Sequence, residues 1–517
     1  MISRVATASL NGVDGVSVTV EVHVSNGLPG FTIVGLPDAA CRESRDRVRA
    51  ALLSSSFSWS TKRITVNLAP SGTRKNGAGL DLPIAIGFLV ATGELSETQI
   101  EDVGFIGELG LDGTIRPVPG TLSLIDAIQN PAVVVAARSV FEASILGNKQ
   151  IHSALDLAEL VAALKGLRPF GQYNHFRPST QAKKYQVDEG IEASMDLDIS
   201  EVRGQRLGKR ALEVCAAGGH NVLLVGPPGA GKTMLARRLV SILPKLSSKQ
   251  ALEVTRIRSA AGLELDHSFY DQIPPFRSPH HRASLVALIG GGSSTMRPGE
   301  ISLAHHGVLF LDELGEFQVS ALESLRQPLE EGLIRISRCR TTVTFPARFQ
   351  LVAAMNPCPC GEGFLPGSCR CTPQQINRYT RRLSGPLLDR FDLRVPINPP
   401  TPEELMVEGK RPNSEEIKIR IESARKRQQD RAGKLNSDLT TNELSKHAEL
   451  TEQAKALLAR RLASGTLSAR GLVRIKKVAL TISDLEGGTR CLDSHHVSEA
   501  LELRVGLAML SPQMMVA

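Results

Sequence analysis

The 517-residue chain has few aromatic side chains, few cysteines and no long apolar run, and each shortage excludes a class of protein. Aromatic residues make up 4% of the sequence, which argues against the stacked aromatic platforms that bind single-stranded nucleic acid. Eight cysteines in 517 residues are too few to form a disulfide scaffold. The longest uncharged apolar stretch, Leu82 to Thr92, is shorter than the roughly 20 residues of a membrane-spanning helix. The first residues contain no apolar signal-peptide core.

What the chain does have is enough apolar sequence to build several cores. Its 42% apolar and 22% charged residues exclude a wholly disordered chain, and at about 100–200 residues per domain the length predicts three or four domains. We therefore expect a soluble, cytoplasmic protein with no membrane partner. The formal net charge of +8 is compatible with a polyanionic partner such as DNA without demonstrating one. With so few aromatics, any nucleic acid would be held by its phosphate backbone.

Three regions and a linker differ in pattern and together predict an α/β multidomain protein. An α+β domain is expected over residues 1–168, with strands at 16–24, 63–68 and 132–137 and helices at 39–53 and 81–91. Residues 169–195 are polar and are expected to form a linker. Fully apolar runs typical of a buried parallel sheet occupy 221–225, 308–311 and 349–354 within the region 196–400. A helical domain is expected over 401–517, with a capping box at 401–404 and helices at 417–434 and 472–485.

A phosphate-binding loop follows the first of these apolar runs. Its pattern is G-x-x-x-x-G-K-[ST] between a strand and a helix, which is the context that the motif requires. The glycines turn consecutive N–H groups toward phosphates, Lys232 would reach the β- and γ-phosphates, and Thr233 would bind Mg²⁺. The residues expected to bind ATP here are Gly226, Pro227, Pro228, Gly229, Ala230, Gly231, Lys232, Thr233 and Met234.

The next two apolar runs end in polar residues suited to hydrolysis. The run 308–311 ends in Asp312, expected to orient hydrated Mg²⁺, and Glu313, expected to polarise the attacking water. The run 349–354 leads to Asn356, whose amide could hold the same water. Further on, Arg390 is open to two interpretations: an ion pair with a nearby aspartate, or an arginine offered to the γ-phosphate of a neighbouring subunit.

These motifs in this order resemble those of an AAA+ ATPase. The segments FRSPHHRAS, IGGGSSTMRPGEISLAHHG and AAMNPCPCG resemble the magnesium-chelatase-like branch, and most closely the ComM/YifB family. The resemblance implies a homo-hexameric ring with ATP between neighbours and Arg390 as the finger. It implies that Arg470 touches the nucleotide of its own chain, with Arg474 as a rival for that role. The adenine pocket is implied to begin at Val202, Gly204 and Gln205.

A hairpin is expected over residues 333–345, because apolar residues alternate there with polar ones. In the family that the chain resembles, a hairpin at this place enters the central channel. Arg335, Arg338 and Arg340 would then grip DNA phosphates without reading bases, although a solvated turn is the alternative. A second channel insertion is expected at Gly290–Gly292 with residues 297–300, mostly from the position that the family gives it.

Four cysteines gather within 14 residues: Cys358, Cys360, Cys369 and Cys371. In a reducing compartment this grouping favours a closed, structural zinc site, with four reduced thiols as the alternative because the C-x-C spacing is uncommon. For the pairs His280/His281 and His305/His306 we favour packing or hydrogen bonding over a metal role.

The N-terminal region resembles the protease domain of Lon, with the ribosomal S5-like fold, in the segments 66–83 and 107–113. Lon-type hydrolysis needs a serine activated by a lysine, but the aligned positions are Gly79 and Leu122. We therefore expect the fold without proteolysis. Arg74 and Lys75 could bind DNA, although a solvated loop is the favoured interpretation.

The resemblance implies an ATP-dependent DNA motor that acts as a helicase and promotes branch migration when incoming single-stranded DNA recombines during natural transformation. It would bind single-stranded, duplex and branched DNA without sequence preference, with recombination proteins as possible partners and ATP, Mg²⁺ and Zn²⁺ as cofactors. The alternatives are a remodelling ATPase that acts on protein partners and a magnesium-chelatase-like metal-insertion subunit. The Lon-like domain argues against the latter, and the arginines at the hairpin tip argue modestly against protein threading.

Overall fold

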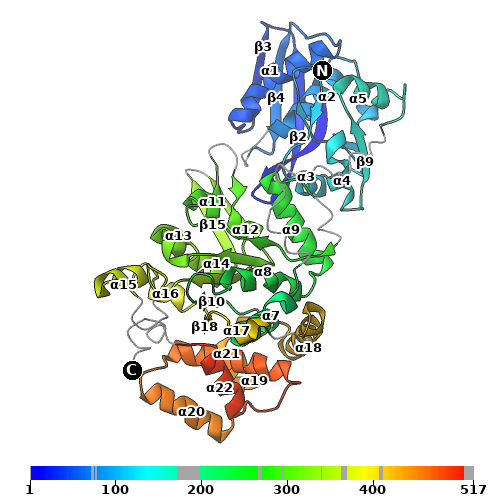
Figure 1. Ribbon diagram of the computed structural model, residues 1–517. Coiled ribbons are helices and arrows are strands. Elements are labelled where there is room, and N and C mark those ends of the chain that lie inside the picture. The colour runs from blue at the N-terminus through cyan, green and yellow to red at the C-terminus, as the bar shows by residue number, and fades with distance from the viewer. Residues whose placement is uncertain are drawn as a thin grey trace.

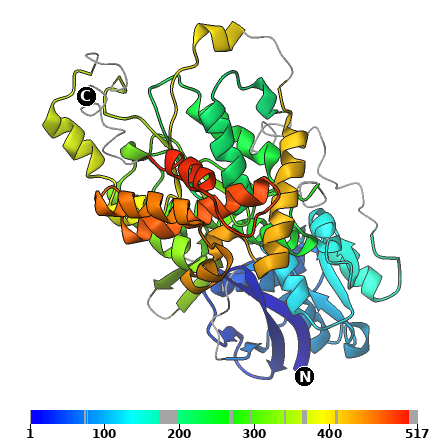
Figure 2. The same ribbon diagram turned by 90° about the horizontal axis from the view of Figure 1, so that it is seen from below.

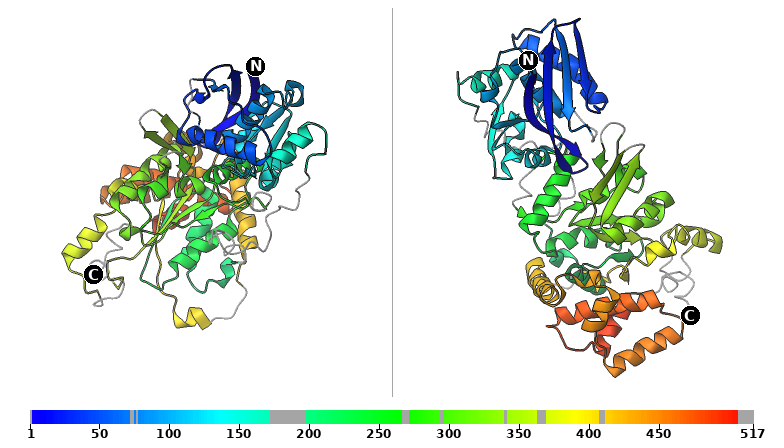
Figure 3. Two further views of the ribbon diagram at one scale, coloured as in Figure 1. Left: turned by 90° about the horizontal axis from the view of Figure 1, so that it is seen from above. Right: turned by 180° about the vertical axis from the view of Figure 1, so that it is seen from behind.

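The computed structural model describes residues 2–71, 75, 78–171, 197–265, 271–292, 296–338, 341–362, 369–406 and 411–505. Three tiers follow one another along the chain, with the N-terminal domain, a central domain and a helical domain stacked in that order (Figure 1). The view from behind keeps the same order of tiers (Figure 3). Among the described residues, no helix has the length and apolar character needed to cross a bilayer. The expected linker, 169–195, lies almost entirely outside the described residues.

The N-terminal domain is a mixed sheet with helices packed on it. The seven strands lie in the order β3 (Gly30–Val34), β4 (Arg63–Ala69), β2 (Asp14–Ser25), β1 (Ile2–Asn11), β5 (Val103–Phe105), β8 (Ala132–Ala136) and β9 (Gln150–Ala154). A short ribbon joins β6 (Glu108–Leu109) to β7 (Ile115–Arg116). The helices are α1 (Ala39–Ser54), α2 (Asp81–Ala91), α3 (Thr121–Ala127), α4 (Val140–Ser144) and α5 (Leu157–Leu164).

The expected elements of this domain are confirmed because their apolar patterns match their burial. Helix α2 spans the predicted residues 81–91 and is buried along its whole length. Strand β2 alternates buried and more exposed residues, as a strand with one covered face requires. The long first strand β1 was not foreseen, because its polar threonine and serine side chains are buried there and bond backbone carbonyls. Thr7 Oγ1, for example, donates to the Phe105 carbonyl oxygen at 2.7 Å.

The central domain is built on a five-stranded parallel sheet. Its strands lie in the order β11 (Phe276–Arg277), β14 (Val308–Leu311), β17 (Gln350–Met355), β10 (Val222–Val225) and β18 (Leu393–Pro396). All residues of β10, β14 and β17 are buried, as expected for a sheet covered on both faces. The helices are α7 (Arg206–Gly218), α8 (Lys232–Ile242), α9 (Ser248–Ala261), α11 (Leu285–Ile289), α12 (Glu300–Leu303), α13 (Val319–Ser324), α14 (Arg326–Glu331), α15 (Pro373–Thr380) and α16 (Gly385–Leu388).

Two hairpins project from this core. The longer one pairs β15 (Leu333–Arg338) with β16 (Thr341–Pro346), and the shorter pairs β12 (Gly290–Gly291) with β13 (Arg297–Pro298). In the longer hairpin Ile334, Ile336, Val343 and Phe345 are buried, which confirms the predicted alternation.

The C-terminal tier is helical. It contains α17 (Pro402–Met406), α18 (Ser414–Ala432), α19 (Thr441–His447), α20 (Glu452–Ala463), α21 (Ala469–Leu485) and α22 (Ser494–Glu502). The predicted capping box is present, since Thr401 N–H donates to the Glu404 carboxylate at 3.0 Å and Glu404 N–H donates to Thr401 Oγ1 at 3.3 Å. Seen from below, α20 and α21 lie across the end of the molecule, and α18 stands at their side (Figure 2).

Shared hydrophobic clusters join the tiers. One cluster runs from one face of the parallel sheet into the helical tier, and another runs from the opposite face into the N-terminal domain. Helix α9 meets the N-terminal domain directly: the Gly120 N–H donates to the Ser259 carbonyl oxygen at 2.9 Å, and Arg256 pairs with Asp126 at 2.7 Å. The turn after β1 also lies against the longer hairpin, where a Cβ added at Gly12 would be 2.7 Å from the Val343 side chain. The N-terminal domain thus contacts the middle of the hairpin.

Candidate active site

The phosphate-binding loop leaves the carboxyl end of β10 and enters α8, as the sequence predicted. Gly229 and Gly231 have φ angles of +76° and +88°, which side chains with a Cβ rarely adopt. Gly226 has a different reason to be glycine, because an added Cβ would lie 2.1 Å from the carbonyl oxygen of Ile397. The loop is therefore shaped by local backbone requirements. Of the remaining residues in the expected set, Ala230 is buried and the Met234 side chain is exposed.

Lys232 points into the loop. Its ammonium donates hydrogen bonds to the carbonyl oxygens of Gly226 at 2.7 Å and Pro227 at 2.8 Å, and to Asn356 Oδ1 at 3.1 Å. Burial lowers the pKa of Lys232, although the charges of Asp312 and Glu313 oppose this effect. The structure therefore brings together Lys232 and Asn356, which are 124 residues apart.

The two residues expected to hold Mg²⁺ also meet. Thr233 Oγ1 donates to Asp312 Oδ2 at 2.7 Å, across the start of α8 and the end of β14. A hydroxyl and a carboxylate are oxygen ligands of the kind that Mg²⁺ prefers, with water completing its shell. The pair therefore fits the ion that the sequence predicts.

Glu313 has a partner that sequence reasoning missed. Its Oε2 lies 3.0 Å from Nδ1 of His281, and its backbone adopts φ +52°. His281 follows β11, whose carboxyl end lies at the same edge of the sheet as that of β14, because the two strands pair in parallel. The ring of His281 packs edge-on against Phe317, with 6.5 Å between the ring centroids. The one hint of this contact in the sequence is the pair of histidines that follows a strand of the same sheet.

The residues expected at the adenine pocket lie against the same loop. Gln205 Nε2 donates to the carbonyl oxygen of Ala230 at 2.8 Å, and Val202 is buried. Gly204 has φ +62°, and an added Cβ would be 2.7 Å from the Glu404 carboxylate. The structure brings this segment to the phosphate-binding loop and also links it to the start of α17.

Arg390 lies at the amino ends of the parallel strands, opposite the carboxyl ends where the phosphate-binding loop begins. It precedes β18, whose first residue pairs with the first residue of β10, whereas the phosphate-binding loop follows the last. At about 3.3 Å per residue, four residues of strand separate the two edges by about 13 Å. Neither of the nearby aspartates, Asp389 and Asp392, pairs with Arg390, whose ion-pair partner is Glu330 near the end of α14. Burial, Arg474 and Arg470 all lower the pKa of the Arg390 guanidinium.

The arginines of α21 lie at this same edge. Arg470 is 3.6 Å from the carboxylate of Asp389, and Arg474 is 2.6 Å from that of the buried Asp392. The structure holds Arg470 beside Asp389 at this edge, and its expected contact with the nucleotide of its own chain stays a prediction. The docking of the helical tier onto the amino ends of the strands, which local sequence does not reveal, carries Arg470 to the side of Arg390.

The four clustered cysteines converge after Asn356. Their sulfurs all lie within 4.8 Å of one another, with Cys358 to Cys360 at 3.3 Å, Cys369 to Cys358 at 3.7 Å and Cys360 to Cys369 at 3.8 Å. A tetrahedral ion with sulfur ligands at about 2.3 Å separates its sulfurs by about 3.8 Å, so the thiols, Cys371 among them, fit zinc. The cluster also borders the phosphate-binding loop, since a Cβ at Gly361 would lie 2.7 Å from the Pro228 ring.

Two histidine clusters have the right residues for a metal but the wrong tautomers. His305 Nδ1 accepts the Arg348 N–H at 2.9 Å, so the neutral ring carries its proton on Nε2, which faces Glu253. His496 Nδ1 likewise accepts the Asp493 N–H at 3.0 Å, and its Nε2 faces Glu486. A nitrogen that carries a proton offers no lone pair to a metal. The hydrogen-bonding interpretation given for His305/His306 therefore holds.

The DNA-binding residues expected in the hairpins are described in part. The Arg335 side chain is 55% exposed and lies 3.4 Å from the Glu331 carboxylate. The side chain of Arg338 and the whole of Arg340 lie outside the described residues, as do residues 293–295 of the second insertion. The segment expected to form the second insertion contains the short β12–β13 hairpin, and its place in a channel stays a prediction.

In the N-terminal domain, one expectation is wrong. Lys75 is fully buried, and its ammonium donates to the Pro70 carbonyl oxygen, so this side chain is neither a DNA contact nor solvated. Arg74 lies outside the described residues. Leu122 is buried, and its N–H donates to the Glu142 carboxylate at 2.9 Å, which also accepts from Ser259 of α9. The position aligned with the Lon lysine thus lies at the joint with the central domain.

Comparison with known proteins places similarity along nearly the whole chain. Three family models match in succession: subunit ChlI of Mg-chelatase over residues 20–138, magnesium chelatase subunit ChlI over 198–405, and the magnesium chelatase subunit ChlI C-terminal model over 411–504. The uncharacterized protein YifB of Escherichia coli (strain K12) is 42% identical over 508 residues, which cover 97% of each chain. Competence protein ComM of Haemophilus influenzae is 42% identical over 503 residues, which cover 96% of each chain. The magnesium-chelatase 67 kDa subunit of Chlorobaculum parvum is 27% identical over 165 residues, or 31% of this chain and 23% of that subunit.

Proposed function

The chain belongs to the family that includes the YifB proteins and Competence protein ComM, a magnesium-chelatase-like AAA+ family, and from this membership we propose a specific activity. The protein is an ATP-driven hexameric DNA motor, a helicase that promotes branch migration when incoming single-stranded DNA recombines during natural transformation. The main support for ATP hydrolysis is the convergence of four side chains at the carboxyl ends of the parallel strands, namely Lys232, Thr233, Asp312 and Asn356.

Each residue of the site has a part in hydrolysis. Lys232 leaves the loop carbonyls and moves to the β- and γ-phosphates when ATP enters, because phosphate oxygens carry more negative charge. Thr233 and Asp312 would hold Mg²⁺, which neutralises charge on the phosphates. Glu313 accepts a proton from the attacking water, and the Asn356 amide orients that water.

The position of Arg390 supports the proposed ring. Arg390 lies at the end of the sheet opposite its own phosphate-binding loop, which supports its action on the nucleotide of a neighbouring subunit. Arg390 then neutralises charge on the transferred phosphoryl group, and its contact with Glu330 is exchanged for one with phosphate. Hydrolysis thus depends on assembly, and six subunits close the ring.

DNA is held in the channel through its backbone. The longer hairpin stands on the edge of the central domain with its apolar side buried, and Arg335 is exposed on it. Arg338 and Arg340 complete the proposed grip on phosphates, which makes binding independent of sequence and strongly dependent on salt. A zinc ion bound by Cys358, Cys360, Cys369 and Cys371 would fix the loop that follows Asn356 and that packs on Pro228.

The deciding experiment is ATP hydrolysis with no DNA, single strands, duplex and three- and four-way junctions, with Glu313→Gln as the inactive control. Several-fold stimulation by DNA in the wild type but not in the control is expected, and a labelled junction assay then separates branch migration from unwinding. Hydrolysis that is robust but indifferent to every DNA would refute the motor and direct attention to protein partners. Hydrolysis stimulated by a protoporphyrin and Mg²⁺ would favour metal insertion instead.

A further inference from the structure

The outer face of α15 forms a basic surface that the proposed mechanism does not use. The helix starts two residues after Cys371, with a capping box between Thr372 and Gln375. Its inner side chains, Ile376 and Tyr379, are buried. Its outer side chains are exposed at Gln374, Asn377, Arg378 and, one residue beyond the helix, Arg381.

All the charged residues in and around α15 are basic. Residues 369–388 contain four arginines and no acidic residue. Arg382 donates to the Gly315 carbonyl oxygen at 2.8 Å and lies 3.3 Å from the Glu316 carboxylate. Among the described residues, Arg378 and Arg381 have no ion-pair partner within salt-bridge distance. Within the described part of the chain, these two guanidiniums therefore have no carboxylate to neutralise them.

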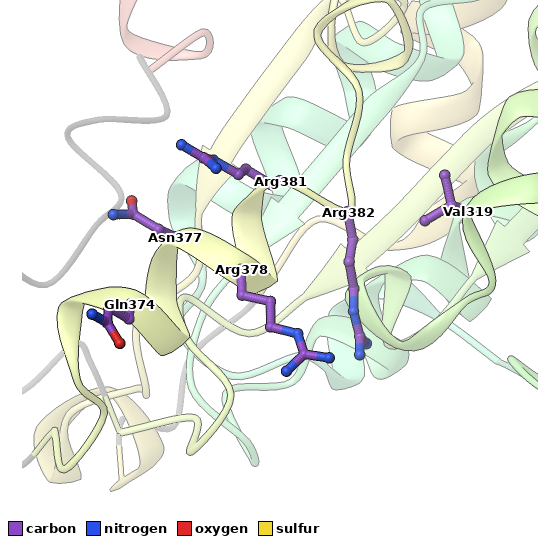
Figure 4. Close-up of a pocket in the computed structure, with 6 residues that line it drawn as sticks. All are labelled: Val319, Gln374, Asn377, Arg378, Arg381 and Arg382. Carbon is purple, nitrogen blue, oxygen red and sulfur yellow. The ribbon is translucent and has the colours of Figure 1, made fainter.

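These side chains surround an open pocket of about 490 Å³ between α15 and α13. Its lining residues are Val319, Gln374, Asn377, Arg378, Arg381 and Arg382. Figure 4 shows Arg378 and Arg382 extending toward the same side of the helix, whereas Arg381 points the other way. Arginines with amide side chains beside them are the residues that contact phosphates and sugars in nucleic-acid complexes.

We propose that this face of α15 binds the phosphodiester backbone of a nucleic-acid strand, at a site separate from the channel hairpins. The proposal rests on the proposed function, because it assumes that DNA is the polymer on which the protein acts. In this proposal a strand that runs along the face places phosphates near Arg381 on one side and near Arg378 on the other. An acidic surface of a neighbouring subunit is the competing occupant, and the test below separates the two.

The buried side of the same helix reaches the nucleotide site. A Cβ at Gly315, two residues after Glu313, would lie 2.4 Å from the Tyr379 ring, and the Tyr379 hydroxyl shares a hydrogen bond with the backbone of Asn356. Burial raises the pKa of Tyr379 to about 12, so the hydroxyl keeps its proton. A strand bound outside α15 therefore biases the positions of Asn356 and the Glu313 turn, and stimulates hydrolysis.

The test compares the double variant Arg378→Gln/Arg381→Gln with a control, Arg42→Gln/Arg49→Gln, on the exposed face of α1. Affinity for a fluorescent duplex is measured over a range of salt concentrations, together with ring size by light scattering and hydrolysis without DNA. Each lost phosphate contact reduces the salt slope by about 0.9, so the double variant is expected to fall about 1.8 below wild type. Its ring size and basal hydrolysis should match wild type, DNA stimulation should drop severalfold, and the control should change none of these.

Three results would overturn the assignment. An unchanged salt slope in a variant that still forms rings would show that no phosphate is bound there. Loss of the ring would assign the face to contact between subunits. If wild type itself bound no DNA, the proposed function would fail as well, and this outcome is distinguishable because it is seen before any substitution is made.

Discussion

Replacing His281 by alanine is expected to raise ATP hydrolysis in the absence of DNA. His281 Nδ1 lies 3.0 Å from Glu313 Oε2, so this carboxylate oxygen is engaged with the imidazole instead of an attacking water. The same loop leads into α11 and the β12–β13 hairpin, the second proposed channel insertion. DNA that displaces the insertion would withdraw His281 and free the base.

The size of the effect follows from the exposure of the pair. A hydrogen bond to a charged group contributes about 1.5–3 kcal/mol where water is excluded. The Glu313 side chain is 56% exposed, and solvent screening reduces the contact to about 1 kcal/mol. An energy of about 1 kcal/mol changes the population of the free carboxylate about fivefold. Basal hydrolysis by His281→Ala should therefore rise about three- to fivefold, and stimulation by DNA should shrink by the same factor.

Steady-state phosphate release with and without duplex DNA measures both quantities. His280→Ala is the matched control, because the His280 ring lies against that of His281, with 4.1 Å between the centroids, but its Nδ1 accepts a hydrogen bond from the Arg282 N–H. The double variant His281→Ala/Glu313→Gln should be inactive, which shows that the gain passes through the carboxylate. A tenfold fall in the basal rate of His281→Ala would refute the reasoning, since it would mean that the histidine positions the base for catalysis.

Three shorter predictions concern the metal, the finger and stability. Cys369→Ser should lose one bound zinc per chain by elemental analysis, whereas Cys491→Ser, outside the cluster, should keep it; equal zinc in both would contradict the cluster assignment. Arg390→Ala should lower kcat at least 100-fold while ATP affinity, measured with a fluorescent analogue, stays within about twofold, because Arg390 lies at the far edge from its own phosphate-binding loop. Burial alone would raise the pKa of Asp392, but its hydrogen bond to His220 and the charge of Arg474 hold that pKa well below the ordinary value. A carboxyl with a depressed folded-state pKa stabilises the fold above its unfolded pKa, so the melting temperature should fall as the pH drops below about 4, and less so in Asp392→Asn; parallel melting curves would exclude this contribution.

Local sequence patterns were sufficient to predict much of the nucleotide site. The spacing of Gly226 to Thr233 between an apolar run and a helix predicted the loop, because strand, glycine turn and helix are neighbours in sequence. The carboxylates after β14 and the amide after β17 could be assigned to the same edge, since parallel strands all present their carboxyl ends there. The alternation of apolar and polar residues predicted the hairpin of 333–345, and the close spacing of four cysteines in the sequence predicted their cluster.

The tertiary structure decided what the arginines, His281 and Lys75 do. Arg390 pairs with Glu330 of α14 in the same domain, and Arg470 lies beside Asp389 because the helical tier docks on the amino ends of β10 and β18. His281 reaches Glu313 because β11 pairs with β14 at the edge of the sheet, and Lys75 is buried by residues distant in sequence. These contacts depend on strand order and domain docking, which arise from the burial of apolar surface shared by distant segments and leave no periodic signal in any one of them.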